Sequence, residues 1–266
     1  MRRLGYTADS IREFCRRVSI TRRWNTAEIE LLEHCLREDL NKKSNRALAV
    51  LRPLKLVIEN YPEDQVEYLE AANNPQHGDS GTRKIPFSKE LFIEQDDFME
   101  NPPKKFFRLT VGREVRLRYG YLITCTEIIK DPITDEILEL RCTYDPETRG
   151  GNAPDGRKVK STIHWVSANH SINAEVRLYE RLCLDPEPDI SDGNSLETVL
   201  NPNSLEIISS AKVEPSLKEL TTGSPIQFER LGYFCLDSED SKNSNNLVFN
   251  RTVSLRDSWA KTQLSN

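Results

Sequence analysis

Apolar residues follow two different spacings along this chain, and the spacing changes near residue 45. Before that point they recur at the i, i+3, i+4, i+7 interval of an amphipathic helix. Thr7 or Asp9 is placed to cap a first helix, which precedes a turn at 19–24. The apolar stripe of this helix consists of Ile11, Phe14, Cys15 and Val18.

A second helix is predicted before the polar residues 41–45. Asn25 and Glu28 have the spacing of a capping box at its start. Two short helices cannot bury both of their stripes against each other alone, so residues 1–44 are expected to form a helical subdomain of a larger unit. The stripe of the second helix consists of Ile29, Leu32, Leu36 and Leu40.

After Arg46 the pattern changes to short β-type runs with turn residues between them. Many short strands at close spacing indicate barrels or sandwiches and argue against a parallel α/β sheet. The predicted fold class is therefore mainly β with an N-terminal α-helical segment. The β-type runs lie at 48–62, 85–93, 115–121, 138–144, 161–166, 174–182, within 196–213 after a short helix or turn, and at 226–236 and 248–255.

The stretch from Lys104 to Tyr121 contains six basic and four aromatic side chains against one acid. Strand alternation from Val115 would place Arg116 and Arg118 on one face, roughly 6.5–7 Å apart. Two guanidinium groups at that spacing, with aromatic residues nearby, suit the bases or phosphates of a single strand. A solvated outer face of a half-buried strand explains the same pattern, and the stretch alone leaves both interpretations open.

Composition bears on this choice through charge. The net charge of −5 counts against a nucleic-acid partner. However, the acids gather at 94–100, 185–197 and 236–240, away from the basic stretch, and such segregation lets an acidic protein present a positive face. A second basic group lies on the Gly-rich loop 145–160 and consists of Arg149, Arg157, Lys158 and Lys160.

Several classes of chemistry have no support in the residues. Phosphate-binding loops, dinucleotide fingerprints, nucleophile elbows and HExxH are absent, so neither catalytic nor cofactor-binding residues are expected. The six scattered cysteines form no CxxC, which indicates reduced thiols and a cytoplasmic location. His164 and His170 would share a strand face, but they have no adjacent carboxylate, so no metal site is expected. No apolar run approaches membrane length, and the N-terminus lacks a secretory h-region.

Long segments of the chain resemble the C-terminal, anticodon-binding part of bacterial-type glutaminyl-tRNA synthetases, which are class I aminoacyl-tRNA synthetases. The similarity runs from Arg2 to Lys261. It is carried by RRLGYTADSIREFC, LEHCLREDLN, LKLVIENYPE, GTRKIPFS, DDFMENPPKKFFRL, GREVRLRYGY, CTYDPETRGGNAPDGRKVKSTIHWVSANH, AEVRLYERL, QFERLGYFCLDS and VFNRTVSLRDSWAK.

This resemblance implies a helical subdomain at 1–44 followed by two anticodon-binding β-barrels. The first barrel region would occupy 45–147, and the second would occupy 148–266 with strands returning to the first. Full-length members attach glutamine to tRNA(Gln) with ATP, using HIGH-like and KMSKS-like motifs that do not occur here. The chain alone is therefore expected to be inactive, to bind no ATP, to be a monomer and to be a fragment or a split half with a separately encoded catalytic partner.

The resemblance also implies roles for particular residues. Arg46 and Gln227 match positions that read the middle base of the anticodon, and Arg108 matches one at the third base. Arg116 and Arg118 match arginines around the first base, whereas Lys105 and Arg230 match neighbouring loop positions. Phe107 departs from members that have a lysine there, which puts that contact in doubt.

Three alternatives remain. A glutamate-specific ligase of the archaeal and eukaryotic type shares the barrel architecture. A stand-alone RNA-binding or regulatory module would have no catalytic partner. A nonfunctional remnant would not bind tRNA.

Overall fold

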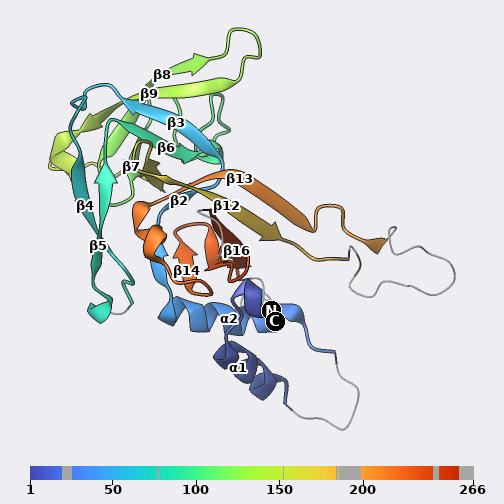
Figure 1. Cartoon of the computed structure of the whole chain (residues 1–266). Coiled ribbons are helices and arrows are strands. Elements are labelled where there is room, and N and C mark those ends of the chain that lie inside the picture. Colours follow the sequence, from blue (N-terminus) through green and yellow to red (C-terminus); the bar gives the residue numbers. More distant parts are fainter. Residues whose placement is uncertain are drawn as a thin grey trace.

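The change of spacing near residue 45 marks the change from helices to strands. The structure is a computed structural model and describes residues 1–19, 26–76, 78–151, 153–183, 185, 199–241 and 246–257. Figure 1 shows the helices below two curled sheets, with a separate hairpin beside them. The chain begins with the 3-10 helix η1 (Arg2–Leu4), followed by α1 (Ala8–Val18) and α2 (Ile29–Lys43).

The two helices confirm most of the predicted helical pattern. Thr7 is the N-cap of α1, and its hydroxyl accepts the backbone N–H of Ser10 at 3.1 Å. The helix α2 begins after Glu28, which makes no side-chain cap; the predicted turn at 19–24 and Asn25 lie largely or wholly outside the described residues. Neither α-helix in the described part of the chain has the length and apolar content to cross a bilayer.

The apolar stripe of α2 is mostly buried, whereas that of α1 is not. Leu32, Leu36 and Leu40 of α2 are buried, and the last two pack with Tyr233 on the sheet above. Ile29 is exposed, and α1 buries only Ser10. The stripe of α1 is thus incompletely covered, as expected for two helices that belong to a larger unit.

The first sheet has seven strands in the order β10-β7-β8-β9-β3-β6-β11 and curls into a nearly closed barrel. Its core contains Trp165, with the Phe87 ring edge-on to it at 5.1 Å between centroids. The strands are β3 (Pro53–Ile58), β6 (Glu90–Glu94), β7 (Glu114–Leu117), β8 (Leu122–Lys130), β9 (Ile137–Asp145), β10 (Thr162–Ile163) and β11 (Trp165–Ser167).

The second sheet also has seven strands, in the order β1-β14-β15-β16-β12-β13-β2, and is likewise barrel-like. Phe228 stacks on Phe234 at 4.4 Å and meets Phe249 edge-on at 5.0 Å in its core. The strands are β1 (Asn45–Ala47), β2 (Ala49–Val50), β12 (Ile172–Tyr179), β13 (Leu205–Val213), β14 (Pro225–Phe228), β15 (Gly232–Leu236) and β16 (Leu247–Ser254).

Smaller elements complete the structure. Strands β4 and β5 pair as a separate antiparallel hairpin. Of these two strands, β4 was not predicted from the sequence. These elements are β4 (Glu67–Ala72), β5 (Thr82–Phe87), η2 (Gly78–Ser80), η3 (Gln95–Asp97), η4 (Pro146–Thr148) and η5 (Pro215–Glu219).

The chain passes between the two barrels through residues 47–51. Leu48 and Val50 belong to the core of the first barrel, whereas Ala47, Ala49 and Leu51 belong to the core of the second. An extended chain sends successive side chains to opposite faces, so burial on both faces requires the unbroken apolar run found here. Strands β1 and β2 thus join the second sheet, while β10 and β11 join the first. The predicted division at 147/148 stays a prediction.

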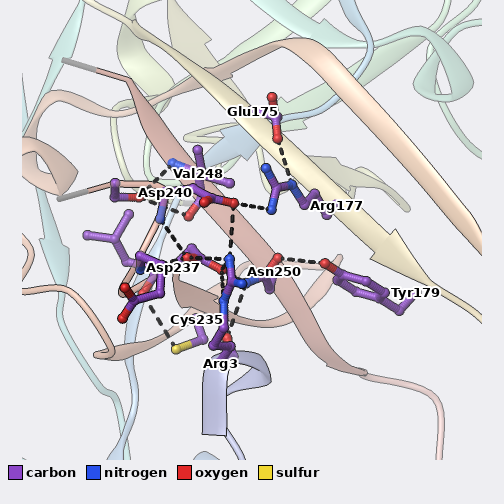
Figure 2. A network of polar contacts seen from close by, with 12 residues as sticks. Arg3, Glu175, Arg177, Tyr179, Cys235, Asp237, Asp240, Val248 and Asn250 are labelled. Atoms are coloured by element: carbon purple, nitrogen blue, oxygen red, sulfur yellow. Dashed lines mark hydrogen bonds and ion pairs between the residues drawn. The ribbon is translucent and has the colours of Figure 1, made fainter. Parts of the chain in front are cut away.

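A buried carboxylate fixes the N-terminus to the second sheet (Figure 2). Both oxygens of Asp237 accept hydrogen bonds from the Arg3 guanidinium, three in all, and Asp237 accepts one more from the Asn250 amide. Burial by itself raises the pKa of Asp237. The backbone N–H groups of Asp240 and Glu239, together with Asn250 and Arg3, outweigh burial and lower this pKa to about 2.

The lowered pKa gives a test of stability against pH. Because the folded-state pKa of Asp237 lies below its ordinary value, its stabilisation is complete above about pH 4 and is lost as the pH falls from about 4 to about 2. We expect Asp237→Asn to reduce the free energy of unfolding at pH 7 by about 1–3 kcal/mol. Urea titrations from pH 7 to pH 2 should show a smaller acid-induced loss in the variant. Asp64→Asn, at an exposed turn, is the control, and equal effects of both variants would contradict this account.

Candidate nucleic-acid interface

Strand pairing places Arg46 and Gln227 side by side. The two residues are register partners in the parallel pair β1–β14, although they lie far apart in the sequence. Neighbouring strands are about 4.8 Å apart, so the two side chains leave the same face of the sheet together. Gln227 is mostly buried, and the Arg46 side chain is half-buried. Within the described residues, the Arg46 guanidinium makes no hydrogen bond or ion pair, so its donors remain available.

Asp97 binds two of the predicted arginines. Its carboxylate is only 1% exposed and receives a two-pronged contact from Arg230, at 2.6 and 2.7 Å. The Arg108 Nε lies 3.4 Å from the same carboxylate, and Arg108 also donates to the Asp96 carbonyl at 2.8 Å. Asp97 ends η3 of the first barrel, whereas Arg230 occupies the β14–β15 turn of the second. The contact therefore joins the two barrels.

Glu229 joins the barrels in the reverse sense, because here the second barrel supplies the acid and the first supplies the arginine. Its buried carboxylate lies 2.8 Å from the Arg118 Nε and accepts a hydrogen bond from the Tyr119 hydroxyl. The Arg118 guanidinium also stands 4.9 Å from the centre of the Tyr119 ring. Burial raises the pKa of Tyr119, and the hydrogen bond to Glu229 adds to this increase. The side chain of Arg118 is thus held at the boundary between the barrels.

The strand predicted through Tyr121 is shorter than expected, and this part of the prediction is wrong. Strand β7 ends at Leu117, and Tyr119 has a left-handed backbone conformation with φ of 63°. The turn gives Arg116 and Arg118 different partners. Arg116 donates to the Thr148 carbonyl at 3.2 Å, and burial lowers the pKa of its guanidinium. The two arginines do not act as a parallel pair of forks.

Lys105 lies with Arg108 on the wall of an open hollow of about 610 Å³ beside η3. Its side chain is exposed and makes no ion pair with the part of the chain that the structure describes. Phe107 lines the same hollow and is 51% exposed. The roles of Lys105 and the other predicted residues in RNA contact stay predictions.

The chain matches models of a known protein family over two ranges. The family described as tRNA synthetases class I (E and Q), anti-codon binding domain, matches residues 44–145 and again residues 162–237. The chain belongs to this family. Together the two matches cover more than half of the chain.

Curated relatives carry a more specific name. The chain is 54% identical over 261 residues to the glutamine–tRNA ligase of Nitrobacter winogradskyi and 52% identical over 260 residues to that of Colwellia psychrerythraea. It is 48% identical over 259 residues to that of Clostridium kluyveri. These alignments cover 98%, 98% and 97% of this chain but 46% of each relative. The chain thus spans about half the length of the curated relatives it matches.

The role of the acid Asp97, close to the basic stretch in the sequence, is not evident from the sequence alone. The acids at 94–100 were predicted to lie apart from the basic residues, but Asp97 is buried and contacts Arg108 and Arg230. Glu94 is also buried, and its carboxylate accepts the backbone N–H groups of Leu51 and Arg52. His164 was expected to have no adjacent carboxylate, whereas its Nε2 lies 3.4 Å from Glu94 and its Nδ1 lies 2.8 Å from Arg230. His170 instead contacts Ser167 at 2.9 Å. Within the described ranges, no three His, Cys, Asp or Glu side chains are grouped as metal ligands would be.

The contact between Asp97 and the two arginines makes a prediction about stability. We expect Asp97→Asn to lower the free energy of unfolding by up to about 3–5 kcal/mol, because the change leaves Arg230 without its buried counter-charge. Urea unfolding at pH 7 measures this effect. Asp96→Asn is the control, because it changes a neighbouring exposed carboxyl. Asp96 contacts Arg108 only through its backbone carbonyl, which the substitution leaves in place. Equal stability of both variants would show that the Asp97 contact does not join the barrels.

Proposed function

We propose that this chain recognises the anticodon loop of a tRNA, and that the tRNA is tRNA(Gln). The family match supports anticodon binding, and the names of the relatives favour glutamine over glutamate, although the family includes both specificities. The observation that carries the proposal is the pairing of Arg46 with Gln227. This pairing brings two predicted base-reading residues from distant segments to one face.

The chemistry of this pair suits the edge of an unpaired base. A guanidinium only donates hydrogen bonds, whereas the Gln227 amide both donates and accepts. Together they select a base edge that combines carbonyl acceptors with a donor, provided that the base is turned out of its stack. Because Gln227 is mostly buried, a base that cannot satisfy its amide is disfavoured strongly.

The other arginines act at the boundary of the two barrels. Ion pairs with buried carboxylates hold three of them in place, namely Arg108, Arg118 and Arg230. A hydrogen bond to a backbone carbonyl holds Arg116. Phosphate oxygens are strong acceptors for arginine, so an RNA strand at this boundary would share or replace these contacts. Lys105 would add a phosphate contact from the neighbouring loop.

The proposal extends to the attachment of glutamine to the tRNA. The chain supports ATP-dependent attachment of glutamine that is carried out by the part of the relatives outside this alignment, encoded upstream or separately. By itself it is inactive in ligation, binds no ATP, is a monomer and acts in the cytoplasm. A glutamate-specific role is the second candidate, because the family description names both amino acids.

Binding to anticodon arms tests the proposal directly. We expect the chain to prefer the tRNA(Gln) arm over an arm with a changed middle base, and Arg46→Ala to reduce this discrimination by about 1–3 kcal/mol. Fluorescence anisotropy at fixed salt measures both affinities. Arg12→Ala, an exposed arginine on α1, is the matched control.

Three results would count against parts of the proposal. If Arg46→Ala weakens both arms equally, Arg46 contacts a phosphate and does not read the base. If the wild-type chain binds both arms equally, anticodon recognition fails altogether. A preference for the tRNA(Glu) arm would favour the second candidate.

A further inference from the structure

Phe107 projects from the loop between Pro103 and Leu109. The Phe106 N–H donates to the Pro103 carbonyl at 2.9 Å, and the Arg113 guanidinium donates to the Phe106 carbonyl. These contacts fix the backbone next to Phe107, while its side chain remains 51% exposed. About half of this apolar ring is left uncovered by the chain itself, and the uncovered half can contact a ligand.

The ring lies between two hollows. One has a volume of about 370 Å³ and is lined by Phe107 together with Lys158 and Lys160. The other, of about 610 Å³, is lined by Phe107 together with Lys105 and Arg108. The Lys160 Nζ lies 5.4 Å from the centre of the ring, which is within cation–π distance. One aromatic side chain therefore connects the predicted Arg108 position to a second basic hollow.

The cations in the smaller hollow differ in their availability. Arg157 contacts Glu114 at 2.9 Å, Asp155 at 2.6 Å and also Asp145, so its charge is neutralised. Lys158 and Lys160 are exposed, and neither makes a hydrogen bond or ion pair with the residues that the structure describes. The available positive charge of this hollow is thus concentrated next to the exposed ring.

We propose that Phe107, Lys158 and Lys160 form a subsite for one unpaired nucleotide, in which a base stacks on the ring and the two ammonium groups bind the adjoining phosphate. An exposed aromatic ring beside unpaired cations is the combination that binds single strands without selecting a particular base. The subsite rests on the proposed function and extends it, because neither lysine is among the predicted anticodon contacts. It also gives Phe107 a role that does not need a positive charge at this position.

Salt-dependent binding to the tRNA(Gln) anticodon arm separates the two contributions. We expect Phe107→Ala to weaken binding about fivefold to a hundredfold, the range for loss of one stacked base, with little change in salt dependence. Phe107→Trp should retain binding. Lys158→Ala combined with Lys160→Ala should reduce the slope of log affinity against log salt by about 0.7, because the two lysines bind one phosphate and each single-strand phosphate contact contributes about 0.7.

A charge-matched control uses Lys55→Ala combined with Lys89→Ala. Both of these lysines already form ion pairs with acids, so the salt slope should stay at its wild-type value. Unchanged binding by Phe107→Ala, or an unchanged slope in the Lys158/Lys160 variant, would overturn the subsite. If Arg46→Ala still reduces base discrimination in that case, the proposed function stands without the subsite. Wild-type binding that ignores the anticodon would instead overturn the proposed function.

Discussion

Two reciprocal ion pairs hold the barrels together, and the arrangement of the candidate interface depends on them. Glu229 and Arg230 are neighbours in one turn of the second barrel. Glu229 binds Arg118 of the first barrel, and Arg230 binds Asp97 of the first barrel. Both carboxylates are buried, and a buried carboxylate is tolerated only when it is paired and hydrogen-bonded. The arginines nearest the proposed RNA path are therefore positioned before any RNA arrives.

The polypeptide connection supports the same arrangement. Residues 47–51 contribute alternate side chains to the cores of both barrels, so neither barrel can form its complete core without this segment. The strand β1 in this region also places Arg46 next to Gln227. Packing of the cores and presentation of the two proposed base-reading residues thus depend on one short stretch of chain.

Local sequence pattern predicted both helices and the fold class. The capped helix α1, the stripe of α2 and the mainly β fold followed from the spacing of apolar residues and from turn residues. The β4 strand was missed because its run of Glu and Ala has low strand propensity and is stabilised by its partner β5. The turn at Tyr119 was missed because alternation continues through it, although the backbone conformation reverses there.

The site was less predictable from local pattern than the fold was. Basic and aromatic density indicated a nucleic-acid surface, and the family resemblance supplied Arg46 and Gln227. The pairing of Asp97 with Arg230 and of Glu229 with Arg118 joins segments far apart in the chain. The acids at 94–100 were expected to lie apart from the basic stretch, since a single sequence contains no signal for which acids become buried.

The central claim is that strands β1 and β14 present Arg46 and Gln227 as one base-reading unit. A double-mutant cycle of Arg46→Ala and Gln227→Ala, measured as affinity for the tRNA(Gln) anticodon arm, tests this claim most directly. We predict a coupling free energy of about 0.5–3 kcal/mol, which vanishes when the middle base is changed. Additive effects on the tRNA(Gln) arm would contradict the account, because two residues that bind the same base cannot act independently.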